Sequence, residues 1–165
     1  MRYSGVIYND ITAAPGLSVT FFTQGCPHAC PFCHNPDTWD FEGGKEFTSD
    51  VLDSIVDNIK SEGILRNLCI MGGEPLCEEN QFLTLLVINE VKKLYPDVPV
   101  YIWTGYTYEE LMIRKDYRLE QILNLTDYII DGPYIDSLRD ITLNMRGSSN
   151  QRIINLHEID NTKKI

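Results

Sequence analysis

Short apolar segments alternate along the chain with longer segments whose apolar residues follow helical spacing. The short segments are rich in β-branched and aromatic residues and are bounded by Gly, Pro or Asp, a pattern that predicts β-strands. The predicted strands cover residues 17–23, 67–71, 98–103, 127–130 and 151–156.

Three of the intervening segments have the pattern of amphipathic helices. The first spans 48–63 and begins with a Thr-Ser pair that can cap it, and the second spans 78–95 and stops before a proline. A third helix is expected to start at Thr107, whose spacing to Glu110 is that of a capping box. Strands that alternate with helices predict an α/β fold with a mainly parallel sheet.

Four loops with unusual residues directly follow predicted strands. They cover 24–33, 72–75, 104–106 and 131–134, and they contain most of the Gly-Pro, Gly-Gly and Cys motifs of the chain. In parallel sheets, ligands bind beyond the carboxyl ends of the strands. We therefore expect these four loops to share one site.

Length and composition predict one globular domain, residues 1–165, with an ordinary core. The net charge of −10 argues against a protein that grips nucleic-acid phosphates, because such proteins cluster Lys and Arg. No apolar run reaches the roughly 18 residues needed to span a membrane, and residues 1–10 do not have the pattern of a secretory signal. The expected location is the cytoplasm, where thiols stay reduced.

Three of the five cysteines, Cys26, Cys30 and Cys33, form a C-x3-C-x2-C pattern within eight residues. An odd count with this crowding disfavours disulfides and indicates a metal site. Iron–sulfur clusters are held by thiolates, usually four. A [4Fe-4S] cluster held by three cysteines leaves one iron open to a ligand that is not part of the protein.

Other metal-binding proteins remain as alternatives, either a zinc-stabilised binding module or a small iron–sulfur electron carrier. His28 or His34 could complete a zinc site, although structural zinc sites usually pair two knuckles. Cys69 and Cys77 do not form a second knuckle, since they stand apart around a strand end. Cys69 is expected to be a small core residue.

The triplet, with aromatic Phe32 directly before its last cysteine, resembles the signature of the radical S-adenosylmethionine superfamily. The loop Gly72-Gly73-Glu74-Pro75, at a predicted strand end, is similar to the Gly-Gly-Glu motif of that superfamily. The resemblance implies a single-domain, partial (β/α) barrel of the radical S-adenosylmethionine type. In such a site the amino and carboxylate groups of S-adenosylmethionine chelate the open iron, and reduction splits this cofactor into methionine and a 5′-deoxyadenosyl radical.

The resemblance also suggests which residues bind the cofactor. It assigns Glu74 and the backbone of Gly72 and Gly73 to the methionine amino group. Thr104 and Asp131, at the third and fourth strand ends, are candidates for polar contacts with cofactor or substrate, with a plain turn as the alternative. The full set of expected cofactor-binding residues is Phe32, Cys33, His34, Gly72, Gly73, Glu74, Thr104 and Asp131.

Longer segments resemble one family more specifically. Residues 21–28, 104–111, 131–134 and 146–152 are similar to the anaerobic ribonucleoside-triphosphate reductase-activating proteins, and the likeness extends over 15–156. It implies that the deoxyadenosyl radical removes a hydrogen from one glycine of the reductase, with an electron donor such as flavodoxin. Residues 34–46 also resemble pyruvate formate-lyase-activating enzymes, which are longer chains and form the alternative.

A partial barrel formed by 165 residues leaves one side open, which suits a substrate that is a flexible segment of another protein. Ser148, Ser149, Asn150 and Arg152 could lie near that opening and contact the partner. A polar turn before the last strand is the alternative interpretation.

Overall fold

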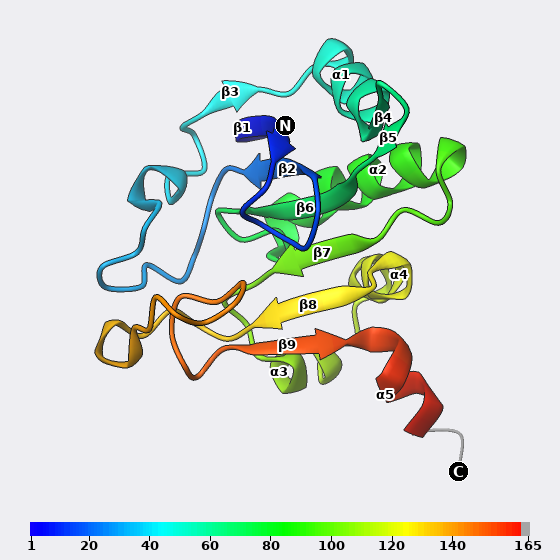
Figure 1. Ribbon diagram of the computed structural model, residues 1–165. Helices are drawn as coiled ribbons and strands as arrows, with labels where there is room; N and C mark the ends of the chain where they lie inside the picture. The colour runs from blue at the N-terminus through cyan, green and yellow to red at the C-terminus, as the bar shows by residue number, and fades with distance from the viewer. Residues whose placement is uncertain (163–165) are drawn as a thin grey trace.

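A mixed sheet organises residues 1–162, the part of the chain that the computed structural model describes (Figure 1). Its seven strands are β1 (Arg2–Asp10), β2 (Ser18–Thr23), β3 (Lys45–Glu46), β6 (Asn67–Gly72), β7 (Val100–Trp103), β8 (Tyr128–Asp131) and β9 (Arg152–Asn155). They lie in the order β3-β1-β2-β6-β7-β8-β9. The pairs β2–β6, β6–β7 and β7–β8 are parallel, whereas β1, β3 and β9 pair antiparallel.

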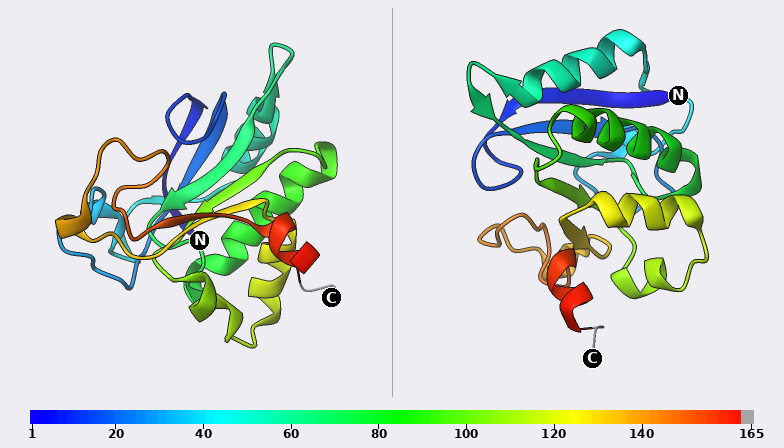
Figure 2. Two further views of the ribbon diagram at one scale, coloured as in Figure 1. Left: turned by 60° about the horizontal axis from the view of Figure 1, so that its bottom comes forward. Right: turned by 90° about the vertical axis from the view of Figure 1, so that its right-hand side faces the viewer.

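Three helices cover one face of this sheet, as the right-hand view of Figure 2 shows. They are α1 (Ser49–Ile59), α2 (Glu78–Leu94) and α4 (Tyr117–Leu125), and α2 contacts both of the others. The remaining helical segments are α3 (Tyr108–Met112), α5 (Leu156–Thr162) and the 3₁₀ turns η1 (Pro36–Thr38) and η2 (Asp136–Leu138). Among the described residues, none of the helices combines the length and apolarity that crossing a membrane requires.

Each central strand divides its side chains between the two faces of the sheet. Ile70 and Ile102 are fully buried in the cluster that includes the inward residues of α1, α2 and α4. The intervening residues Cys69, Tyr101 and Ile130 form a second cluster with the N-terminal loop on the opposite face. This division follows from the two-residue period of a strand. Cys69 is a fully buried core residue, as predicted.

The predicted strands and helices are present, and the capping box of Thr107 and Glu110 is formed. The first predicted helix is too long, because the chain leaves it after Ile59 and turns through Glu62 and Gly63 at positive φ. That turn joins the short strands β4 (Lys60–Ser61) and β5 (Ile64–Leu65).

The prediction of a mainly parallel sheet is confirmed only for its centre. The strand predicted at 151–156 is present as β9, but it pairs antiparallel with β8. Strand β1, which pairs antiparallel with β2, was not predicted, because its sequence contains Gly5 and several polar residues and most of its residues are only partly buried. Helix α4 was also not predicted, although Leu119, Ile122 and Leu123 are buried at helical spacing.

We expect Ile102→Ala to lower the free energy of unfolding by about 2–5 kcal/mol, because it leaves a cavity between the sheet and its helices. Ile113→Ala is the matched control, since Ile113 is 80% exposed and should change stability by less than about 0.5 kcal/mol. Urea denaturation of the iron-free chain measures both values. Equal effects of the two substitutions would contradict this account of the core.

Candidate iron–sulfur and cofactor site

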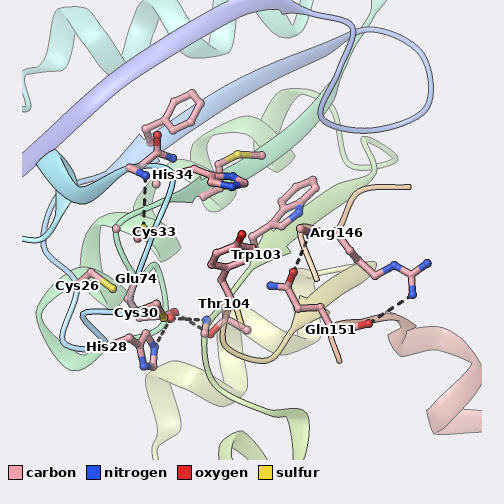
Figure 3. A pocket seen from close by; sticks show the side chains of 18 of the residues that line it. Cys26, His28, Cys30, Cys33, His34, Glu74, Trp103, Thr104, Arg146 and Gln151 are labelled. Carbon is pink, nitrogen blue, oxygen red and sulfur yellow. Dashed lines mark hydrogen bonds and ion pairs between the residues drawn. The ribbon is translucent and has the colours of Figure 1, made fainter. Parts of the chain in front are cut away.

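The loops that follow β2, β6, β7 and β8 meet at one edge of the sheet and line a cavity of about 530 Å³ (Figure 3). The four loops therefore lie together, as expected, around one cavity. The lining includes all three clustered cysteines, both glycines of the Gly-Gly-Glu motif, and one or more residues from each remaining loop.

The cysteine loop is held in shape by its own backbone. Gly25 N–H donates to Thr38 O at 2.8 Å and Cys26 N–H donates to Trp39 O at 3.1 Å, so both ends of the loop are tied together. A tight turn closes between Cys30 O and Cys33 N at 3.1 Å. Cys26, Cys30 and Cys33 are each partly exposed at the cavity, whereas Cys69 and Cys77 are buried.

The donor groups fit a cluster better than a single ion. Among the side chains that the structure describes, residues 1–159, no three of His, Cys, Asp or Glu are grouped so that they could hold one metal ion. His28 and His34, the candidate fourth zinc ligands, contact Glu74 and Tyr134 instead. A closed zinc site needs four ligands around one point, whereas cluster ligands are spread over separate irons.

Burial raises the pKa of the Cys26 thiol to about 11, and the nearby negative charge of Glu74 adds to the effect. Burial also raises the pKa of Cys30. Because the thiolate is the metal-binding form, a metal that bound here would have to displace a proton from each of these groups. In the absence of iron, both side chains are neutral thiols at physiological pH.

Glu74 connects three of the loops through a carboxylate with no exposed surface. Its Oε1 accepts hydrogen bonds from Leu76 N at 2.9 Å and from Thr104 Oγ1 at 2.8 Å. Its Oε2 accepts one from Gly105 N at 2.7 Å and lies 2.7 Å from His28 Nε2. A carboxylate offers about four acceptor positions.

The four hydrogen-bonding contacts of the Glu74 carboxylate thus come from His28, from Leu76 in its own loop, and from Thr104 and Gly105. Glu74 also lines the cavity, and its contact with the amino group of the cofactor stays a prediction. The backbone of Gly72 and Gly73 lines the cavity. Thr104 also lines the cavity, but its hydroxyl hydrogen is donated to Glu74.

His28 is a site residue whose role was not recognised in the sequence, where it was considered only as a zinc ligand. Besides its contact with Glu74, its ring packs edge-on against Tyr106 at 4.4 Å between centroids. A Cβ atom on Gly105 would lie 2.5 Å from the His28 ring, so this approach requires glycine. These contacts join separate loops, and no local pattern reveals them.

Two of the expected cofactor-binding residues do not line the cavity. The side chain of Phe32 is 76% exposed. Asp131 is buried, and its carboxylate accepts hydrogen bonds from the Arg152 guanidinium at 2.5 and 3.0 Å and from Tyr108 N at 2.8 Å. Asp131 therefore anchors β9 and α3. His34 does line the cavity.

The cavity extends further along the sheet than the motifs suggested. Ile7, Asp10, Thr12 and Ala13 form this extension from the N-terminal segment. The Asp10 carboxylate accepts hydrogen bonds from the backbone and hydroxyl of Thr12 at 2.8 and 2.7 Å, which fixes the loop after β1. Sequence patterns missed this wall because β1 itself was not predicted.

The segment 146–152 forms the wall opposite the cysteines. Arg146 and Gln151 line the cavity, and Figure 3 shows them across from Cys26 and Cys30. Gln151 Oε1 accepts hydrogen bonds from Gly147 N and Ser148 N at 2.8 and 3.1 Å, which shapes the turn.

The four residues considered for partner contact differ in their surroundings. Ser148 is fully buried and its hydroxyl accepts a hydrogen bond from Ile135 N, while Asn150 donates to Pro133 O. Arg152 is bound by Asp131 and Glu109. Ser149 is exposed and its backbone N–H donates to Leu138 O at 2.9 Å, so most of the segment stabilises the turn.

The fold is that of an α/β protein, and the chain, with its cysteine loop, matches an iron–sulfur domain. The family model described as "4Fe-4S single cluster domain" matches residues 13–154. Relatives named anaerobic ribonucleoside-triphosphate reductase-activating protein are similar along nearly the whole chain.

The relative from Salmonella typhi is 34% identical over 157 residues, which cover 94% of this chain and 99% of the relative. The one from Escherichia coli K12 is 32% identical with the same coverage. The one from Pasteurella multocida is 36% identical over 154 residues, 93% of this chain and 96% of the relative. The chain therefore belongs to the family of the anaerobic ribonucleoside-triphosphate reductase-activating proteins.

We expect Cys30→Ala to lose most of its bound iron after anaerobic reconstitution, because one corner of the cluster loses its ligand. Cys69→Ala, a control inside the sheet, should keep the iron content of the unmodified chain and lose only stability. Iron analysis and the visible absorption spectrum measure both variants. Full iron content in Cys30→Ala would contradict the ligand assignment.

The raised pKa of Cys26 predicts how its reactivity depends on pH in the iron-free chain. The thiolate is the nucleophile, so alkylation of Cys26 by iodoacetamide should keep rising about tenfold per pH unit above pH 9, up to about 11. Peptide mass spectrometry measures the rate at each cysteine. A rate that levels off near pH 9 would show that burial does not raise this pKa.

Proposed function

We propose that this chain activates an anaerobic ribonucleoside-triphosphate reductase by generating a glycyl radical on it. One observation carries the proposal: three cysteines, and not four, face a cavity that the Gly-Gly-Glu loop also lines. The names of the similar proteins support the same activity.

In this proposal, Cys26, Cys30 and Cys33 hold three irons of a [4Fe-4S] cluster. The amino and carboxylate groups of S-adenosylmethionine chelate the fourth, with the Gly72 and Gly73 backbone next to the amino group. When bound and reduced, these two cofactors supply one-electron cleavage of a carbon–sulfur bond, which gives methionine and a 5′-deoxyadenosyl radical. Phe32 and Asp131 are left out of the binding set because neither lines the cavity.

In this proposal, the residues of the chain position the target and shield the radical from water. The cavity is walled by apolar side chains, among them Met71, Trp103 and Met145, and Trp103 is fixed by a hydrogen bond from its Nε1 to Met145 O at 2.8 Å. Such walls exclude water and side reactions from a reactive radical and hold the target close. Glycine suits the target, because it has no side chain that blocks approach to Cα.

We further propose that residues 1–165 form one domain with the partial (β/α) barrel of the radical S-adenosylmethionine type. The parallel order β2-β6-β7-β8 with all its motif loops at the carboxyl edge supports this. The sheet has two separate edges, β3 and β9, and the loop of the reductase that carries the target glycine would enter the cavity from the open side. The proposed setting is the cytoplasm, with an electron donor such as flavodoxin.

The direct experiment is anaerobic incubation of the reconstituted chain with the reductase, a reductant and S-adenosylmethionine. The expected result is the EPR doublet of a glycyl radical on the reductase, and Cys30→Ala should give none. The same mixture with pyruvate formate-lyase tests the alternative raised by residues 34–46. A doublet on pyruvate formate-lyase alone would overturn the proposal.

Arg146→Ala should lower the yield of glycyl radical while the iron content stays normal, because Arg146 lines the cavity on the wall opposite the cysteines (Figure 3). The expected loss is about tenfold, the scale of one charged contact. Radical spin counts per reductase measure it, and Ser149→Ala, at an exposed position of the same turn, is the control. Equal yields from Arg146→Ala and the unmodified chain would remove Arg146 from the account.

A further inference from the structure

Helix α2 buries three polar side chains where it begins beneath the Gly-Gly-Glu loop. Asn80, Gln81 and Thr84 are 5%, 1% and 0% exposed. A buried polar group is costly unless it is hydrogen-bonded, so the partners of these side chains indicate what each does. Gln81 donates to Leu76 O at 3.2 Å and Thr84 donates to Pro75 O at 3.0 Å. Both of these contacts stay within the adjoining loop.

Asn80 differs, because its amide reaches two separate loops. Its Nδ2 donates to Glu74 O at 2.9 Å and also to Gly25 O at 3.0 Å. Gly25 directly precedes Cys26, the first cysteine of the cluster loop. The two hydrogens of one side-chain amide therefore connect the cluster loop to the Gly-Gly-Glu loop.

The same two loops also touch through their backbones. Glu74 N–H donates to Gly25 O at 2.8 Å, so this carbonyl accepts two hydrogen bonds. A Cβ atom on Gly73 would lie 2.3 Å from Gly25 O, which shows how closely the two chains approach. Asn80, on helix α2, adds a side-chain link between the same two loops.

We propose that Asn80 is a positioning residue that sets the distance between the first cluster cysteine and the backbone that holds the cofactor. This inference rests on the proposed function. A ligand that is chelated by an iron and held by the Gly72–Gly73 backbone must satisfy both at once, so a small error in their spacing weakens its binding. Loss of Asn80 therefore affects the binding of S-adenosylmethionine more than the binding of the cluster.

The test compares Asn80→Ala with Thr84→Val in the reconstituted protein. Both remove a buried donor from α2, but only Asn80 reaches the cluster loop. The Kd for S-adenosylmethionine is measured from the change that it causes in the EPR spectrum of the reduced cluster. We expect Asn80→Ala to weaken binding about tenfold or more, because the two loops lose the side-chain amide that links them. Iron content and the EPR spectrum without S-adenosylmethionine should stay unchanged, and Thr84→Val should stay within about twofold of the unmodified chain.

Equal Kd values for Asn80→Ala and Thr84→Val would overturn the inference and leave the proposed function intact. A reduced cluster in the unmodified chain that does not respond to S-adenosylmethionine would instead overturn the proposed function.

If Asn80→Ala fails to hold the cluster, the rate of backbone amide hydrogen exchange in the iron-free chain tests whether Asn80 positions the two loops. The Glu74 amide, which donates to Gly25 O, should exchange faster in Asn80→Ala and in Asn80→Ser than in Thr84→Val. The Ser hydroxyl supplies a single donor and can restore only one of the two bonds. The same exchange rate in all three variants would contradict a positioning role for Asn80.

Discussion

The buried carboxylate of Glu74 is the contact on which the geometry of the site depends. A carboxylate without solvent is stable only when its acceptor positions are filled, and those of Glu74 are filled from three different loops. The cluster loop, the Gly-Gly-Glu loop and the loop after β7 are therefore fixed to one another. Asn80 ties the first two together again from below. The walls of the cavity are thus held in place by contacts within the chain.

Different parts of the sheet contribute to stability and to the candidate site. One face packs against α1, α2 and α4 and buries most of the aliphatic core, while the carboxyl edge of the parallel strands presents the motif loops. The antiparallel strands β1 and β9 extend the sheet on either side of the parallel strands. Strand β1 and the segment before β9 bring Asp10 and Arg146 to the cavity. A short chain can in this way surround a ligand on several sides and still leave an entrance for a protein segment.

Local patterns predicted the central strands, the capping box and the four motif loops, because each depends on residues that are close in sequence. The triplet of cysteines and the Gly-Gly-Glu turn were found for the same reason. Local patterns could not reveal that His28 contacts Glu74, that Asn80 joins two loops, or that Arg152 holds Asp131 away from the cavity. Those contacts arise only when distant segments pack. Strand β1 was missed because its sequence mixes apolar with polar residues and glycine, and most of its residues are only partly buried, so it lacks a strong apolar signal.

We propose that three thiolates anchor a four-iron cluster and that its remaining iron binds S-adenosylmethionine. Mössbauer spectroscopy of the ⁵⁷Fe-loaded protein, recorded with and without S-adenosylmethionine, is the sharpest test of this arrangement. We expect one iron of the four to change its isomer shift when S-adenosylmethionine is added, while the other three do not. Four equivalent irons with a spectrum that S-adenosylmethionine leaves unchanged would contradict it.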